Sequence, residues 1–384
     1  MKRKKLIIFL SVPYDKFFKK KHLIHKANKY FDIKYYSIEN FYRKIKSKNK
    51  KNFFIIKDFQ DLKKALGKHK PDIGLMPHDD IHHLRVGKIC REDFNMKVAY
   101  MAINLCPESY IDRSLKLMFS VVFSKFFFNY VYEIIIRLKS SFFKFLSHSE
   151  KNFLFKFDFA IIGGKSGARI NAVENSKKVI ESHSYDLEES VKFKIKKKNY
   201  AVFLDEDLFG HRDYKLQNRK KKFVSKLYFE EINKFFDFFE KKFKIKIVIC
   251  LHPRINKIHI YKKYFNNRKC LIDKSHQLVS SCKYVFLHPS TTALNLPIIY
   301  KKPLIFLTTN ELLGGLELKA RIARRRLNFD QPFINLSKYQ TYNYPKNFNY
   351  IDHEGYKKYM SEFIGSKNNN SKISIWRDFY RYAH

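Results

Sequence analysis

Short apolar runs recur along the chain, separated by longer stretches of mixed polarity. In the first half these runs are KLIIFLS from residue 5, FFIIK from 53, PDIGLMP from 71, KVAYMAIN from 97 and FDFAIIGG from 157. Brief strand-like runs that alternate with helix-length intervals are typical of a parallel sheet flanked by helices. The pattern therefore predicts an α/β fold for this half.

A second series of such runs follows. It consists of YAVFLDED from residue 200, KIKIVICLHPR from 244, KYVFLHPS from 283 and KPLIFLTT from 302. Between the first two runs, KLYFEEINKFFDFFEKKF has the spacing of an amphipathic helix. The second half is thus predicted to form another parallel sheet with helices on its faces.

At 384 residues the chain is too long for one ordinary core and is long enough for two domains. We place the boundary in the lysine-rich passage VKFKIKKKNY, residues 191–200. The predicted domains are 1–192 and 193–345, followed by a helical tail, 346–384. Residues 115–146 form an aromatic-rich insertion, and its basic and aromatic residues suit either a helix in a membrane interface or a buried helix of an ordinary domain.

The chain has 78 Lys and Arg against 36 Asp and Glu, a formal net charge of +42. Such an excess favours a polyanionic partner, yet abundant Lys, Phe, Ile, Asn and Tyr with scarce Gly and Pro also follow from an AT-rich genome. No zinc-finger, RNP-type or basic-zipper pattern appears, so nucleic acid is not the expected partner. The five cysteines have no paired spacing, which fits a reducing compartment and a cytoplasmic protein.

Polar residues follow three strands of the second series. The first predicted strand ends at Asp205, Glu206 and Asp207, the next at His252-Pro253-Arg254 and the third at His288-Pro289-Ser290. In an open parallel sheet, ligands bind beyond the carboxyl ends of the strands. Each group alone is accounted for by a helix cap or a stiff loop, but three in one series predict a site.

The segment HPSTTALNL predicts that a helix begins at Ser290, Thr291 and Thr292, where backbone N–H groups, hydroxyls and the helix dipole favour an anion. The expected anion is a phosphate, with His252, Arg254 and His288 as further donors. A carboxylate at such a site can take a proton from an attacking hydroxyl. Asp205 is the first choice for this base, with Glu206 and Asp207 as alternates.

Two further segments carry candidate residues. GGKSG, from residue 163, and HSYD, from 183, supply Lys165, His183 and Asp186 as candidates for an acceptor site, although a capped turn also explains HSYD. The segment HDDIHH, residues 78–83, contains metal-competent side chains, but clustered His and Asp in a polar loop are more often solvated. No metal or other cofactor is expected.

The second half resembles bacterial surface-carbohydrate biosynthesis proteins in SHSYDLEES, AVFLDEDLFGHRDY, YFEEINKFFDFFE, IVICLHPR and VFLHPSTTALNLPIIYKKPLIFL, over about residues 160–310. The His-Pro and Ser/Thr elements are also similar to those of bacterial GT-B sialyltransferases, polysialyltransferases and Kdo-transferase-like enzymes. This resemblance implies two Rossmann-like domains facing a central cleft. It also implies that His252, Ser290 and Thr291 contact the phosphate of a CMP-sugar. The family's acidic motif usually ends in glycine, whereas here Leu208 follows DED.

The resemblance predicts a glycosyltransferase that moves a sugar from a nucleotide-activated donor, CMP-sialic acid or a Kdo-like sugar, to a glycan or lipid-linked glycan in capsule or lipopolysaccharide assembly. The basic, aromatic-rich chain would suit a peripheral enzyme at an anionic inner membrane surface. Two alternatives stay open. One is a nucleotide-sugar epimerase or hydrolase of the same architecture, and the other is a basic nucleic-acid-binding protein.

Overall fold

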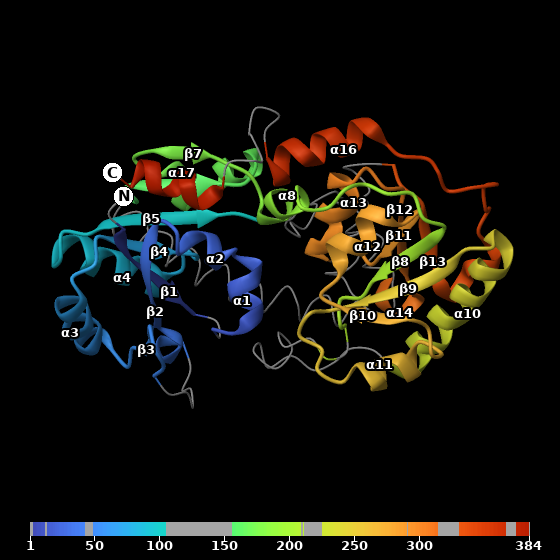
Figure 1. The fold of residues 1–384 in the computed structure, drawn as a ribbon, viewed down its shortest axis with the longest axis horizontal. Helices are drawn as coiled ribbons and strands as arrows, with labels where there is room; N and C mark the ends of the chain where they lie inside the picture. Colours follow the sequence, from blue (N-terminus) through green and yellow to red (C-terminus); the bar gives the residue numbers. More distant parts are fainter. Residues whose placement is uncertain are drawn as a thin grey trace, which may run out of the picture. The chain divides into compact units, whose positions relative to one another are not determined.

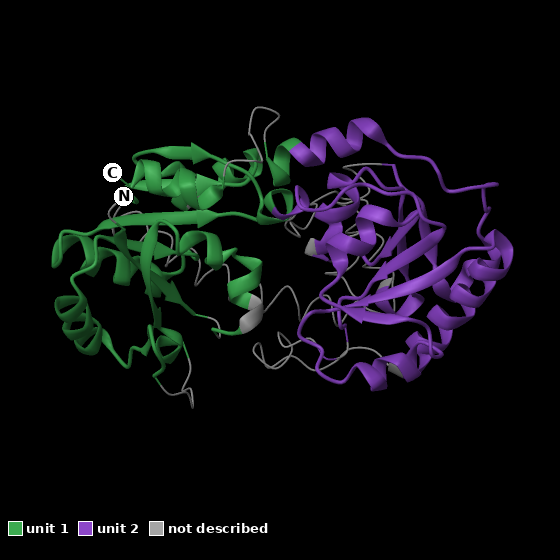
Figure 2. Ribbon diagram, in the orientation of Figure 1, with its two compact units in different colours: residues 1–105, 131–188, 361–384 green, residues 106–130, 189–360 purple. Residues whose placement is uncertain are grey.

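The computed structural model describes residues 3–11, 14–42, 49–104, 156–208, 210, 225–289, 291–313, 330–365 and 374–383. The chain divides into two compact units (Figure 2). Unit 1 comprises residues 1–105, 131–188 and 361–384, and unit 2 comprises residues 106–130 and 189–360. Each unit is built around its own parallel sheet.

Unit 1 contains a seven-stranded sheet in the order β3-β2-β1-β4-β5-β6-β7, in which every pairing is parallel. Its strands are β1 (Lys4–Leu10), β2 (Phe31–Ser37), β3 (Phe53–Ile55), β4 (Ile73–Met76), β5 (Lys97–Ala102), β6 (Phe159–Ile162) and β7 (Val179–Glu181). Its helices and helical turns are α1 (Lys16–Lys21), α2 (Ile24–Ala27), η1 (Glu39–Phe41), α3 (Phe59–His69), α4 (Ile81–Glu92), η2 (Lys165–Arg169), α7 (Asn171–Glu174) and α17 (Ile375–Tyr382). Helix α8 (Tyr185–Ser190) lies at the boundary with unit 2.

Alternate residues along the strands of unit 1 face two separate cores. Leu6 and Ile8 of β1 pack on the face that α17 covers, with Trp376 and Phe379. Ile7 packs on the opposite face, with residues of α3 and α4. Strands buried on both faces must be apolar nearly throughout, which explains the continuous runs in the sequence.

Unit 2 contains a six-stranded parallel sheet in the order β10-β9-β8-β11-β12-β13. Its strands are β8 (Tyr200–Leu204), β9 (Lys246–Leu251), β10 (Cys270–Ile272), β11 (Tyr284–Leu287), β12 (Leu304–Thr308) and β13 (Phe333–Asn335). Its helices and helical turns are α10 (Ser225–Phe243), α11 (Ile258–Tyr264), α12 (Ser275–Ser281), η3 (Thr292–Leu294), α13 (Asn295–Ile299), α14 (Asn310–Leu313), η4 (Leu336–Thr341) and α16 (His353–Tyr359). The π-helical turn η5 (Met360–Ile364) follows α16 and belongs to unit 1 from residue 361.

Helix α10 covers one face of the unit 2 sheet with an aromatic stripe. Ile232, Phe235, Phe236 and Phe239 are each fully buried, and they pack against Phe203, Phe286 and other strand residues. Helix α12 packs against β8 and α13, and α12 and α13 lie on the other side of the sheet from α10 (Figure 1). The predicted amphipathic helix is therefore confirmed, and its apolar side forms the core of this unit.

The α/β fold with two parallel sheets is confirmed, and each strand predicted from an apolar run is present. Sequence reasoning missed β2, β7, β10 and β13. Three of these have only three residues, and β7, β10 and β13 lie at sheet edges. Strand β2 carries Asp32 and Lys34 between apolar residues, so it does not form the continuous run by which the other strands were recognised.

The units differ from the predicted domain ranges at the C-terminus. Residues 346–360 belong to unit 2, whereas 361–384 return to unit 1. There the indole of Trp376 donates to the carbonyl of His22, and Lys4 Nζ donates to the carbonyl of Ala383. Residues 115–146 lie outside the described part of the chain, and within that part no helix is long and apolar enough to span a membrane.

Candidate functional site

The strand order of unit 2 places its switch point between β8 and β11. Counted along the chain from β8, the order is 3-2-1-4-5-6, the doubly wound arrangement in which ligands bind beyond the carboxyl ends of the two central strands. Leu204 of β8 pairs with Leu287 of β11 on one side and Cys250 of β9 on the other. Asp205, His252 and His288 therefore leave three adjacent strand ends.

Asp205 and His252 are in direct contact at this edge. The backbone N–H of Asp205 donates to the carbonyl of Cys250 at 2.9 Å, and the Asp205 carboxyl accepts from the backbone N–H groups of His252 and Asp207. Its Oδ2 is buried without a hydrogen-bond partner among the described residues. The structure thus brings the predicted base next to the His-Pro segment.

The Asp205 carboxyl lies in an environment that disfavours its charge. Burial, followed by the charge of Asp207 and a smaller contribution from Glu206, raises the pKa of Asp205 to about 8, against the opposing backbone hydrogen bonds. At neutral pH the carboxyl is mostly protonated, and it can accept a proton only after it has lost its own. A carboxyl tuned in this way is typical of a functional site.

Asp207 is held by residues outside the acidic segment. Its carboxylate accepts a hydrogen bond from the hydroxyl of Tyr261 on α11 and from the backbone N–H of Gly210 at 3.1 Å. A Cβ at position 210 would stand 2.6 Å from Asp207 Oδ1, so any other residue there would force the carboxylate to move. Asp207 has a backbone φ of 53°, in the left-handed region, which aspartate tolerates better than most residues. A glycine thus does follow the acidic segment, three residues after Asp207.

His252 has a defined tautomer. The backbone N–H of Arg254 donates to His252 Nδ1 at 3.2 Å, so Nδ1 is the acceptor and the neutral ring carries its proton on Nε2. An Nε2–H group is a donor for an anionic oxygen. Arg254 itself is partly buried beside this ring. The local turn therefore prepares His252 to donate, as a phosphate ligand must.

Both ring nitrogens of His288 form hydrogen bonds inside unit 2. Its Nδ1 donates to the carbonyl of Leu307 at 2.7 Å, and its Nε2 accepts from the hydroxyl of Tyr228 at 2.7 Å. Burial lowers its pKa to about 4, so the ring is neutral. With only 1% of the residue exposed, His288 joins the ends of β11 and β12 to α10 rather than presenting a nitrogen to a ligand.

The helix predicted after His288 is short. A single 3-10 turn, η3, precedes α13, and Thr291 Oγ1 accepts from the backbone N–H of Ala293 at 3.0 Å. Two short helical turns have only a small dipole. An anion bound here would therefore be held mainly by hydroxyls and backbone N–H groups. Ser290 lies outside the described residues, and of Thr292 only the backbone is described. Their phosphate contacts stay predictions.

The candidates in unit 1 occupy different environments. Lys165 is exposed in η2, and Asp186 lies in the first turn of α8, where Ser184 Oγ accepts from the backbone N–H of Leu187. His183 is 1% exposed, and its Nε2 lies 3.6 Å from Glu188 Oε2. His183 is thus buried beside the Glu188 carboxylate, which pairs with Lys26, and the acceptor role of all three candidates stays a prediction.

The HDDIHH segment follows β4 at the switch point of unit 1, between β1 and β4. Asp80 caps α4 by accepting from the backbone N–H groups of His82 and His83, and its Oδ2 lies 2.8 Å from His83 Nδ1. Burial would raise the pKa of Asp80, but His83 and Tyr42 together hold it well below its usual value. Within the described ranges, no three His, Cys, Asp or Glu side chains are grouped to hold a metal.

Three functional neighbours escaped sequence reasoning: Tyr228, Tyr261 and Gly210. Tyr228 opens the aromatic stripe of α10, where a tyrosine is difficult to distinguish from a core phenylalanine. Burial, then the charges of Asp205 and Glu206, raise its pKa well above the usual value, which places its hydroxyl near both carboxylates. The only signal in the sequence that could have identified Tyr228 was its hydroxyl group, at the start of a helix face that is otherwise apolar.

No protein-family description and no curated protein sequence matches this chain. Among solved structures, MurG from Acinetobacter baumannii is 7% identical over 87% of this chain and 86% of that chain, with a TM-score of 0.42. The calicheamicin glycosyltransferase CalG4 is 8% identical over 88% of each chain, with a TM-score of 0.45. UDP-GlcNAc 2-epimerase from Neisseria meningitidis is 10% identical over 92% of this chain and 97% of that chain, with a TM-score of 0.40. Likenesses this weak carry no conclusion about reaction or substrate.

Fold and site define the class of this protein. It is a two-unit α/β protein whose second parallel sheet gathers three carboxylates and two histidines beyond its central strands.

Proposed function

We propose that this protein is a glycosyltransferase of GT-B type that uses a nucleotide-activated sugar. Unit 2 binds the donor phosphate through His252, Arg254, Ser290 and Thr291, and Asp205 accepts the proton of the attacking hydroxyl. An acceptor glycan or lipid-linked glycan is bound by the first half of the chain.

The observation that carries the proposal is the pairing of Asp205 with His252. A histidine whose Nε2 is set as a donor by Arg254 lies one strand from a carboxyl whose pKa is raised. The histidine and the carboxyl therefore leave the adjacent ends of β9 and β8, beside the switch point between β8 and β11 where ligands of doubly wound sheets bind.

The chemistry follows from these two groups. Hydrogen bonds from His252 and from the segment after β11 would stabilise negative charge on the departing phosphate and so lower the barrier. The bond from the sugar to the phosphate breaks, the bond to the acceptor oxygen forms, and the acceptor proton passes to Asp205. With a pKa near 8, about a tenth of Asp205 is ionised at pH 7, so the activity should increase with pH.

We favour a CMP-activated sialic acid or Kdo-like donor. The His-Pro and Ser/Thr elements support it, through their similarity to bacterial sialyltransferases, whereas the acidic segment departs from the family's pattern because Leu208 follows Asp207. The net charge of +42 supports a peripheral location at an anionic inner membrane surface, where lipid-linked glycans are assembled.

A nucleotide-binding screen tests the proposal. The protein is heated with CMP, UDP, GDP or dTDP, and its melting temperature is compared with that of the His252→Ala variant. His259→Ala, which removes an exposed histidine of α11, is the matched control. We expect selective stabilisation by CMP that is lost in His252→Ala and kept in His259→Ala.

Other outcomes would change the proposal. Selectivity for another nucleotide keeps the transferase and changes the donor. Consumption of a nucleotide-sugar without any acceptor indicates an epimerase or hydrolase. No response to nucleotides, with tight and strongly salt-dependent binding of RNA or DNA, overturns the proposal in favour of a nucleic-acid-binding protein.

A further inference from the structure

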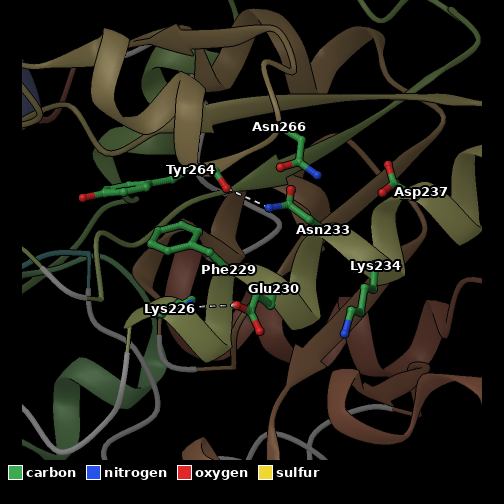
Figure 3. Close-up of a pocket in the computed structure, with 8 residues that line it drawn as sticks. All are labelled: Lys226, Phe229, Glu230, Asn233, Lys234, Asp237, Tyr264 and Asn266. Carbon is green, nitrogen blue, oxygen red and sulfur yellow. Dashed lines mark hydrogen bonds and ion pairs between the residues drawn. The ribbon is translucent and has the colours of Figure 1, made fainter.

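A pocket of about 430 Å³ lies outside the proposed donor site, between α10 and the end of α11 (Figure 3). One stripe of α10 supplies most of its lining, at the helical spacing Lys226, Phe229, Glu230, Asn233, Lys234 and Asp237. Tyr264 and Asn266 supply the rest. This volume falls in the range of small-ligand sites.

An aromatic pair forms one side of the pocket. The rings of Phe229 and Tyr264 are stacked, with centroids 4.7 Å apart and planes inclined by 23°. Phe229 is buried, whereas Tyr264 is 46% exposed. Such a ring offers solvent a flat apolar surface beside a polar tip.

The floor of the pocket is held in place by hydrogen bonds. Asn233 Nδ2 donates to the carbonyl of Tyr264 at 2.7 Å, and Asn233 Oδ1 accepts from Arg268 at 2.9 Å. Buried Arg268 also binds Asp237 and Glu240. These bonds fix the end of α11 against α10, so little ordering would be needed when a ligand binds.

Hydrogen-bonding groups of both kinds surround the aromatic surface. The amide of Asn266 and the ammonium of Lys234 are donors, and the carboxylates of Glu230 and Asp237 are acceptors. Figure 3 shows Asn266, Lys234 and Asp237 around the side of the pocket away from the Tyr264 ring. Sugar hydroxyls donate and accept at once, so they match such a mixed lining, in which Lys226 and Lys234 balance the charges of Glu230 and Asp237.

We infer that this pocket is a carbohydrate-binding subsite, in which the C–H face of a sugar ring packs on Tyr264 and its hydroxyls bond to Asn266, Lys234 and Glu230. The subsite is connected to the proposed site by aromatic contacts. The Tyr264 ring lies 5.9 Å from that of Tyr261, whose hydroxyl donates to Asp207. This sugar binding is separate from the proposed function, which assigns the acceptor to the first half of the chain.

The test starts from the full-length protein on an array of immobilised neutral, amino and acidic glycans. The best-bound oligosaccharide is then titrated in solution by NMR. We expect Tyr264→Ala to weaken its binding about tenfold or more, since the apolar surface is lost. Asn266→Gly should also weaken binding, because glycine keeps the left-handed turn at φ 50° but removes the amide.

Controls separate this inference from the proposed function and from misfolding. Tyr350→Ala removes a 56% exposed tyrosine of the same unit outside the pocket, and it should leave glycan binding unchanged. His252→Ala should lose nucleotide binding and keep glycan binding, and CMP should not displace the oligosaccharide. Glycan binding without any nucleotide binding would overturn the proposed function alone. An array with no bound glycan, displacement by nucleotide, or a Tyr264→Ala variant that folds and binds normally would overturn the subsite.

Discussion

The hydroxyl of Tyr228 donates to Nε2 of His288 over 2.7 Å, while His288 Nδ1 donates to the carbonyl of Leu307 over the same distance. A histidine at the end of a central strand is thereby attached to α10 on one side and to β12 on the other. Both ring nitrogens are satisfied only when Tyr228 is present. This contact fixes the strand end from which the Ser/Thr segment departs.

Replacing Tyr228 with phenylalanine should therefore destabilise unit 2. The ring would still fill its space, but His288 Nε2 would remain buried without a donor, at a cost of about 1–3 kcal/mol. Urea unfolding measures the loss, and Tyr350→Phe, at an exposed tyrosine, should change nothing. An equal free energy of unfolding for wild type and Tyr228→Phe would show that the contact adds no stability.

Asp205→Asn should stabilise the protein at high pH and abolish transfer. The ordinary carboxyl pKa is 3.8, and in the folded protein that of Asp205 is about 8, so unfolding between these values releases a proton. Stability linked to Asp205 is complete below pH 4 and declines as the pH rises to about 8. Asparagine carries no charge, so the variant should have the higher melting temperature at pH 9 and nearly the same one at pH 4.

The same ionisation sets the expected pH dependence of the wild-type reaction. Once the nucleotide screen has identified the donor, the rate should rise with an apparent pKa near 8, since only ionised Asp205 accepts a proton. A rate that is constant from pH 6 to pH 9 would exclude Asp205 as the base and leave Glu206 or Asp207.

Gly210→Ala should impair the site without unfolding the chain. The added Cβ would lie 2.6 Å from Oδ1 and 2.7 Å from Oδ2 of Asp207. This carboxylate cannot withdraw without losing its bonds to Tyr261 and to the backbone of position 210. Asp207 contributes to the raised pKa of Asp205, so its displacement should disturb the proposed base. A misplacement of about 1 Å can reduce the rate about 100-fold.

Gly67→Ala is the matched control for this substitution. A Cβ at Gly67, inside α3, meets only Phe94, at an ordinary distance of 3.8 Å. Alanine should be neutral or slightly stabilising there, because glycine is unfavourable in a helix interior. If Gly210→Ala behaves like Gly67→Ala in nucleotide binding and in turnover, the position of Asp207 has no role in function.

Features that depend on local sequence could be predicted, whereas features that depend on contacts between distant residues could not. The runs that became β8, β9 and β11 are visible because strands buried on both faces must be apolar, and the sheet rule then brings Asp205 and His252 together. The two hydrogen bonds of the His288 ring could not be predicted in this way. It depends on Tyr228, 60 positions away in the chain, and on the carbonyl of Leu307.

The tautomer of His252 is an intermediate case. It depends on the backbone of Arg254 only two residues on, but the sequence does not say how the turn folds. The pocket between α10 and the end of α11 could not be predicted from the sequence either. Its stripe from Lys226 to Asp237 has the composition of a solvated helix face, and only its contact with Tyr264 makes it a pocket.

Glu188→Gln should loosen the C-terminal helix of unit 1. Glu188 is 1% exposed, forms an ion pair with Lys26 at 2.5 Å and accepts from the backbone N–H of Ile375, the first residue of α17, at 2.9 Å. Glutamine keeps the shape but leaves Lys26 and His183 without the carboxylate, at a cost of about 3 kcal/mol. Exchange of the backbone amide hydrogens of Ile375–Tyr382 should be faster in the variant than in the wild-type protein.

The pH dependence distinguishes this charge effect from a packing effect. Burial would raise the pKa of Glu188, but His183 and Lys26 together lower it from 4.5 to about 2, so the stability it contributes is present above pH 4.5 and is lost as the pH falls towards 2. The difference in unfolding free energy between wild type and Glu188→Gln should therefore shrink across that window. Glu189→Gln, at the neighbouring partly exposed pair with Lys192, should cost less than about 1 kcal/mol at any pH. Equal losses for the two variants would mean that Glu188 does not hold α17.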